Sequence, residues 1–181
     1  MLMLLATEMH ASHERIVLVE WGSRTPLHGM GRTAYGYVMN CLALVDLLSQ
    51  YRTGSTKGQT DRMVAFLVDY FGYEERVSRV VVTLWRHTLM HTGKPRELLG
   101  TSGTRYRYLL QWGPEHLPRD QHMRFQASAQ SRILNIGVLF LAEDLQEAAD
   151  KYFDEVDASP HLQRRLLDAE GELTQPHGFR D

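Results

Sequence analysis

Apolar side chains recur along much of this chain at helical spacing and predict a mainly helical protein. Between residues 33 and 51 they return every three or four positions, as in a helix that buries one stripe. The members of this stripe are Tyr37, Cys41, Leu44, Val45 and Leu48. We therefore expect a long helix with one face in the core.

Two further segments near the start of the chain have helical character. Residues 2–20 give a helical signal that is compatible with one helix or two pieces. Residues 62–71 predict a short helix that Thr60 or Asp61 caps and that Gly72 ends.

The segment 73–93 combines a helical and a strand signal. Acidic residues near its start, and Gly93 with Pro95 at its end, are typical of helix boundaries. The β-branched run from Val80 to Thr83 favours a strand instead. Because the segment is too long for a typical strand, we expect a helix. Its buried stripe would comprise Val77, Val80, Leu84, His87 and His91.

After Pro95 the pattern changes to short alternating runs separated by turns. Residues 96–112 predict a β-hairpin around the glycine-containing turn TSGT, and residues 122–126 predict a further short strand. Residues 128–156 carry the longest helical pattern in the chain. Residues 158–181 are polar, and we expect a tail that is partly disordered.

Together these elements predict a mainly α fold, an up-and-down bundle of four to five helices with a small inserted β-hairpin. With 181 residues, of which 43% are hydrophobic, the chain can form one domain with its own core. We expect that domain to span 1–157, followed by the tail at 158–181. The apolar runs are shorter than the roughly 18 residues that cross a bilayer, and the start does not resemble a signal peptide. The single cysteine, Cys41, is expected to be a buried thiol, and the expected location is the cytoplasm, without membrane attachment.

Charge is distributed unevenly along the chain although the net charge is only −2. Residues 76–132 contain ten basic and three acidic residues, a balance of +7, whereas residues 143–181 contain four and eleven, a balance of −7. Of the 20 basic residues 17 are arginine, which suits bidentate contacts with phosphate. The asymmetry is compatible with contact to an anionic partner, but solvated surface charge alone could produce it, and a genome rich in G and C would give the same arginine bias.

The basic segment contains the motif RHTLMH, with Arg86, His87 and His91 at the end of an apolar helix. A histidine can transfer a proton near neutral pH, and an arginine can stabilise the extra negative charge on a phosphorane. RNA carries its own nucleophile, the 2′-hydroxyl, so this pair could cleave RNA without metal or cofactor. Residues five apart lie about 140° apart on a regular helix. The pair can therefore converge only if the helix is distorted or if two chains share one cleft.

Two other interpretations of the motif remain open. His87 and His91 have the i, i+4 spacing of zinc ligands, with His28, His116 or His122 as a candidate third ligand, but the chain lacks an HExxH sequence. Alternatively the histidines are packed in the core or in an interface, and Arg86 binds the end of its helix or an acid on a neighbouring helix.

The motif resembles the signature of the HEPN superfamily (higher eukaryotes and prokaryotes nucleotide-binding), in which an arginine precedes a histidine by five to seven positions and a polar residue often follows the arginine. The order of elements around it is also similar to that of uncharacterised bacterial members over roughly residues 33–157. The resemblance implies a helical homodimer in which the motifs of both chains form one metal-independent endoribonuclease site. Carried over, Arg86 would bind phosphate, His91 would be the acid or base, and His87 would fill the supporting polar position.

The resemblance also brings alternatives and partners. Many members have no demonstrated activity, so a non-catalytic module for nucleotide binding or dimerisation remains an alternative, as does a metal-binding bundle. Some members are toxins of toxin–antitoxin systems and carry a tyrosine two residues after the histidine, where this chain has Gly93. In those toxins a partner nucleotidyltransferase modifies the tyrosine, so Gly93 puts this form of regulation in doubt here. An antitoxin partner is unidentified. Residues that could contact RNA lie beside and after the motif, and they are Lys94, Arg105, Tyr106, Arg107 and Tyr108. Alternating aromatic residues on a hairpin more often serve packing.

Overall fold

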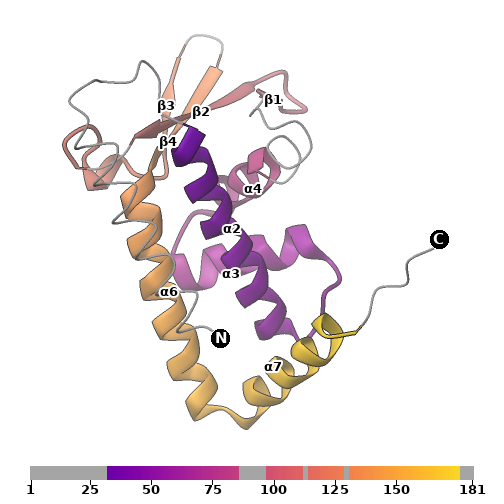
Figure 1. Ribbon diagram of the computed structural model, residues 1–181. Coiled ribbons are helices and arrows are strands. Elements are labelled where there is room, and N and C mark those ends of the chain that lie inside the picture. Colours follow the sequence, from indigo (N-terminus) through magenta and orange to yellow (C-terminus); the bar gives the residue numbers. More distant parts are fainter. Residues whose placement is uncertain (1–31, 86–96, 112–113, 129–130, 176–181) are drawn as a thin grey trace.

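The computed structural model describes residues 32–85, 97–111, 114–128 and 131–175, which form helices with a small sheet at one end (Figure 1). The helices are α2 (Arg32–Thr53), α3 (Gln59–Phe71), α4 (Glu75–Thr83), α6 (Val138–Ala158) and α7 (Pro160–Leu173), with a short 3₁₀ helix η2 (Arg119–Gln121). The strands are β1 (Leu98–Leu99), β2 (Arg105–Gln111), β3 (Arg124–Ala127) and β4 (Ser131–Gly137). The expected mainly α class is confirmed. The helix expected at 2–20 lies outside the described residues.

Helix α2 forms the centre of the helical part. Its expected stripe faces the core, since Tyr37, Cys41, Val45 and Leu48 are buried and Leu44 is half-buried. Helices α3, α6 and α7 all pack against α2. Burial raises the pKa of the Cys41 thiol to about 12, as expected for a packed, unreactive cysteine.

Helices α3 and α4 adjoin in sequence and pack against each other. Gly72 ends α3 in a left-handed conformation with φ 69°, as the sequence predicts, and its N–H bonds to the carbonyl of Leu67. The expected N-cap was wrong, because α3 begins at Gln59 and follows Gly58. The β-branched run is helical in α4, where Val77, Val80, Val81 and Val82 are buried. Tertiary packing thus overrides strand propensity in this segment.

The helix predicted over 128–156 was wrong in its first part. Residues Ser131–Gly137 form strand β4, and the helix α6 begins only at Val138. Strand β4 is central in the sheet and is buried from Leu134 onward, so its pattern is a continuous apolar run without clear alternation. A short buried strand that leads directly into a helix therefore resembles one long helix in sequence.

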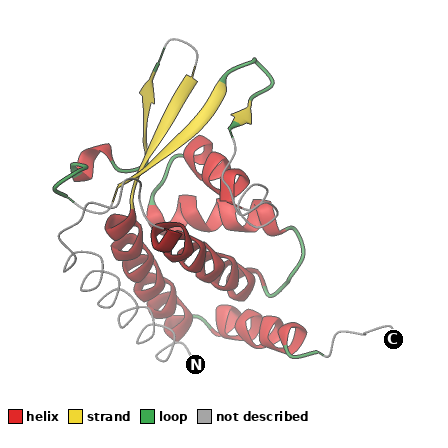
Figure 2. Ribbon diagram, turned by 45° about the horizontal axis from the view of Figure 1, so that its top comes forward, coloured by secondary structure: helices red, strands yellow, loops and turns green. Residues whose placement is uncertain are grey.

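The predicted hairpin exists but belongs to a larger sheet. Strands β1 and β2 pair antiparallel, and the third predicted strand corresponds to β3. The strand order is β1-β2-β4-β3, with β2 and β4 parallel and β3 antiparallel to β4. This mixed four-stranded sheet lies at one end of α2 and α6, and α7 lies at the other end (Figures 1 and 2).

The polar segment expected as a partly disordered tail contains a helix, because residues 160–173 form α7. Ser159 caps this helix by accepting a hydrogen bond from the N–H of Leu162, and Pro160 occupies its first turn. Ala169 is fully buried against the rest of the protein, and Arg165 donates to the carbonyl of Arg52 on α2. Helix α7 therefore belongs to the packed structure. None of the helices in the described ranges is long and apolar enough to cross a bilayer.

Candidate functional site

The arginine–histidine motif directly follows Trp85, a buried residue that we call the anchor. Arg86, His87, His91 and Lys94 lie outside the described residues. After Thr83 the chain continues through a π-type turn at Leu84 and Trp85, whose side chains are 1% and 3% exposed. The Trp85 ring also contacts the Tyr108 ring of β2, with centroids 5.6 Å apart. The residue that precedes Arg86 is therefore fixed between α4 and the sheet.

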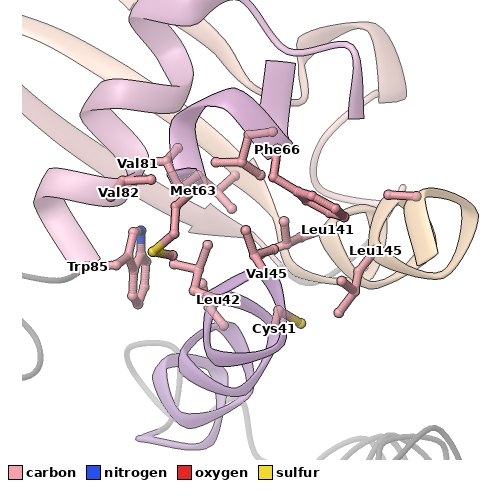
Figure 3. Close-up of a cluster of buried hydrophobic side chains, with 14 of the residues drawn as sticks. Cys41, Leu42, Val45, Met63, Phe66, Val81, Val82, Trp85, Leu141 and Leu145 are labelled. Atoms are coloured by element: carbon pink, nitrogen blue, oxygen red, sulfur yellow. The ribbon is translucent and has the colours of Figure 1, made fainter. Parts of the chain in front are cut away.

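Trp85 lines a small pocket between α2, α3 and α4. Figure 3 shows its ring beside the side chains of Leu42, Met63 and Val82. The pocket has a volume of about 130 Å³. Its lining is mostly apolar and includes Met39, Leu42, Met63, Val82 and Trp85. At its polar edge, Gln59 donates to Asp46 at 2.6 Å, and the buried Arg62 donates to the other oxygen of the same carboxylate at 2.9 Å. Both Asp46 oxygens are therefore already engaged.

The candidate RNA-binding residues of β2 divide between the two faces of the sheet. Arg105 and Arg107 are exposed, whereas Tyr106 is buried and Tyr108 is half-buried. The Tyr106 hydroxyl accepts a hydrogen bond from Arg76, whose guanidinium lies 5.5 Å from the centre of that ring. The structure therefore groups the two arginines with each other but not with the two tyrosines, which pack toward α4.

One acidic residue partly neutralises these two arginines. Glu97, just before β1, pairs with Arg105 at 3.4 Å and with Arg107 through its other oxygen. The three side chains are between about a third and two thirds exposed, so the pairs contribute little to stability. Two guanidinium groups share one carboxylate, which leaves a positive charge on this face of the sheet.

A buried polar cluster that the sequence did not indicate joins four distant segments. Tyr73, which follows α3, donates to Asp144 of α6, and His122 Nε2 lies 3.0 Å from the Tyr73 hydroxyl and 3.2 Å from the same carboxylate. Arg119 of η2 pairs with the other Asp144 oxygen. Gly137, the last residue of β4, donates its N–H to His122 Nδ1 at 2.9 Å. The cluster thus links α3, η2, β4 and α6.

Hydrogen bonding keeps Asp144 ionised in spite of its burial. Burial alone would raise the pKa of this carboxyl, but donors from His122, Tyr73 and Arg119 outweigh it and lower the pKa. Burial and the neighbouring Asp144 carboxylate raise the pKa of Tyr73 well above its ordinary value. The cluster therefore holds a proton on Tyr73 and a charge on Asp144, which suits a structural connection more than proton transfer.

His122, a candidate third zinc ligand, uses both ring nitrogens in this cluster. His116 is exposed, and His28 lies outside the described residues. Within the described ranges no group of three or more histidine, cysteine or acidic side chains is arranged to hold a metal ion. The sequence offered no local signal for the cluster, because Tyr73 is 49 residues from His122 and 71 from Asp144.

Comparison of the chain with protein-family models, with curated proteins and with solved structures found no match in any of the three.

Proposed function

We propose that this chain is a HEPN-like protein that binds RNA and cleaves it without a metal ion. The observation that carries the proposal is the sequence RHTLMH immediately after the buried anchor Trp85. A polar, chemically competent segment that follows a fixed helix end is a suitable position for a site, because rigid packing can position the residues beside it.

The proposed reaction uses only groups of the chain and the RNA. His91 accepts the proton of the 2′-hydroxyl while its oxygen attacks the adjacent phosphorus. Arg86 stabilises the negative charge that develops on the phosphorane oxygens. The bond to the 5′ oxygen then breaks, and this oxygen takes a proton from the histidine of the second chain. The products are a 2′,3′-cyclic phosphate and a 5′-hydroxyl. His87 fills the supporting polar position of the motif.

The convergence of Arg86 and His91 needs either a distorted helix or a second chain. One supporting observation is the π-type turn at Leu84 and Trp85, which directly precedes the motif in the chain. Turns of this kind are frequent at functional sites. The proposal includes a homodimer whose motifs face a common cleft, an up-and-down arrangement of the helices, and a cytoplasmic location.

Charge on the sheet supports an RNA partner. Arg105 and Arg107 project from the exposed face of β2 and share one carboxylate, so they can contact phosphates in a sequence-independent manner. Tyr106 is buried and Tyr108 is half-buried, so the proposal includes no base stacking on these rings. A contact from Lys94 stays a prediction. An antitoxin partner likewise stays a proposal without an identified molecule.

The test is cleavage of mixed RNA by the full-length protein in EDTA. His91→Ala and Arg86→Ala should each lower the cleavage rate by about 10²–10⁴-fold, the range for loss of an acid–base group or of charge stabilisation. His116→Ala, which removes an exposed histidine, is the matched control and should retain the wild-type rate. Mass spectrometry of the products should detect the 2′,3′-cyclic phosphate.

Two outcomes would refute the ribonuclease. Equal cleavage by wild type and His91→Ala would assign the activity to a contaminant, and intact RNA in every sample would leave no activity to explain. If His91→Ala instead shifts the monomer–dimer equilibrium in sedimentation without loss of cleavage, the motif serves dimer packing, as in the non-catalytic alternative.

A further inference from the structure

A polar hollow lies where the two parallel strands β2 and β4 begin. Its volume is about 560 Å³, and the turn before β2 forms one side while residues at the end of β3 and the start of β4 form the other. The side chains that matter here are two arginines and four hydroxyl residues, namely Ser102, Thr104, Arg105, Ser128, Ser131 and Arg132. The described residues that line the hollow include no acidic side chain and no aromatic ring.

The hollow carries excess positive charge. Arg132 is exposed, and within the described part of the chain no carboxylate pairs with it. Arg105 shares the carboxylate of Glu97 with Arg107, so one negative charge is divided between two guanidinium groups. Arg132 is the register partner of Tyr106, so Arg132 and Arg105 stand on opposite faces of the sheet at its edge. An anion at the strand starts can therefore meet a guanidinium with free donors from either face.

The hydroxyl groups add neutral donors. Ser102 and Thr104 lie 3.0 Å apart in one hydrogen bond, and Ser131 donates to Ser128 at 3.2 Å. In a pair of hydroxyls only one hydrogen is used, so each pair retains an O–H that can point to a ligand. The hollow can therefore offer donors from both sides.

Backbone pairing fixes the two sides of the hollow relative to each other. Arg105 and Ser131 are register partners in the parallel pair, so the two strands start at the same level. On one side the N–H of Gly100 bonds to the carbonyl of Thr104 at 2.8 Å, and on the other the N–H of Ser128 bonds to the carbonyl of Ser131 at 2.9 Å. The backbone that carries the donors is thus fixed on both sides before any ligand binds, which lowers the entropic cost of binding.

From this arrangement we infer that the hollow is a binding site for a phosphate group. Guanidinium and hydroxyl donors match the oxygens of phosphate, and the lack of acidic side chains argues against a cation. The lack of aromatic rings argues against recognition of a base. The phosphate can belong to a nucleic-acid backbone or be free in solution. The inference does not depend on the proposed ribonuclease, because no residue of the motif takes part.

The experiment separates these sources with two probes and the full-length protein. Inorganic phosphate is titrated while NMR follows the backbone amide signals of residues 102–104 and 128–132. A fluorescent RNA octanucleotide with 2′-O-methyl groups is titrated by anisotropy, since it lacks the 2′-hydroxyl and stays intact whether or not the protein is a ribonuclease. Arg132→Gln is compared with Arg124→Gln, which removes the same charge from β3 outside the hollow and disrupts only the exposed pair with Glu74.

We expect phosphate to shift the amide signals on both sides of the hollow in wild type and Arg124→Gln, and not in Arg132→Gln. Loss of one charge-assisted contact should weaken octanucleotide binding about tenfold in Arg132→Gln, against less than about twofold in Arg124→Gln. Tighter binding of the octanucleotide than of free phosphate would identify a nucleic-acid backbone as the source, and the reverse order would identify free phosphate.

Equal weakening by both variants would overturn the inference, because it would reflect net charge alone. Absence of phosphate-induced shifts at these residues would also overturn it. Should Arg132→Gln fail to fold, as judged by circular dichroism, Arg105→Gln provides the same comparison from the opposite side of the hollow.

Discussion

The Nδ1 atom of His122 accepts a hydrogen bond from the backbone N–H of Gly137 at 2.9 Å. The other ring nitrogen then carries the hydrogen and donates toward Tyr73 and Asp144, an assignment that follows from the hydrogen-bond partners. A single neutral imidazole thus connects the end of strand β4 to the ionised carboxylate of helix α6. This connection lies at the junction where β4 passes directly into α6.

Asp144→Ala should destabilise the fold by about 2–4 kcal/mol, because it leaves the donors of Tyr73, His122 and Arg119 without their shared acceptor. This loss of stability is smaller than that expected on breaking a fully buried ion pair, because the Arg119 side chain is 48% exposed. Urea unfolding followed by circular dichroism measures the change. The control is the neighbouring Glu143→Ala, whose exposed carboxylate lies 3.8 Å from Arg119 and should contribute at most about 1 kcal/mol. Similar losses in both variants would contradict a special role for Asp144.

The same carboxylate should give the fold an acid-sensitive contribution. Folding lowers the pKa of Asp144 below the value of about 3.9 that it has in the unfolded chain. On acidification the unfolded chain therefore binds the proton more readily than the folded protein. Its stabilising contribution is complete above about pH 4 and is lost as the pH falls through the folded-state pKa. The difference in free energy of unfolding between wild type and Asp144→Asn should therefore shrink below about pH 4. A difference that stays constant with pH would exclude this linkage.

Gly137→Ala should destabilise the protein by about 1–3 kcal/mol through overpacking. An added Cβ would lie 2.5 Å from Cδ2 of Phe140 and 3.4 Å from Nδ1 of His122. The Phe140 ring is buried and contacts both His122 and Arg119, so it has little room to move. Thermal unfolding provides the measurement. Gly36→Ala within α2 has no atom of the described residues within 4 Å of the new Cβ and should instead stabilise by about 0.5–1 kcal/mol.

The pocket beside Trp85 predicts opposite effects of one substitution at adjacent positions. Val82 lines the pocket, so Val82→Ile can place its extra methylene there and should raise stability by up to about 1 kcal/mol. Val81 is equally buried but does not line the pocket, and Val81→Ile should lower stability by about 1 kcal/mol. Urea midpoints of the two variants test this, and equal changes would indicate that the pocket closes in solution.

Local signals predicted the helices whose ends are chemically marked. Gly72 predicted the end of α3 because only a residue that tolerates positive φ fits there. The pair Ser159–Pro160 carries a comparable start signal for α7, which the polar composition of that segment obscured. Strand β4 could not be predicted in this way, because it is defined by its pairing with β2 and β3. Its apolar positions also fit a helix.

The candidate sites differ in the same way, because one lies within a short stretch of sequence and the others form only when the chain folds. The sequence identifies Arg86 and His91 through spacing alone, since both belong to one short motif. Tyr73, His122 and Asp144 meet only after the chain has folded, so no window of the sequence contains them together. The hollow between β2 and β4 depends in the same way on the parallel register of two strands.

The central place of β4 has a consequence for how the protein is made. During synthesis the β1–β2 hairpin emerges first, but the strand that covers its open edge ends only at Gly137. Until the ribosome has released that residue, one edge of β2 can pair with other chains. The exposed arginines of β2 provide charge repulsion in this interval, so replacing Arg105 and Arg107 with apolar residues should increase aggregation of the nascent chain before it affects the finished fold.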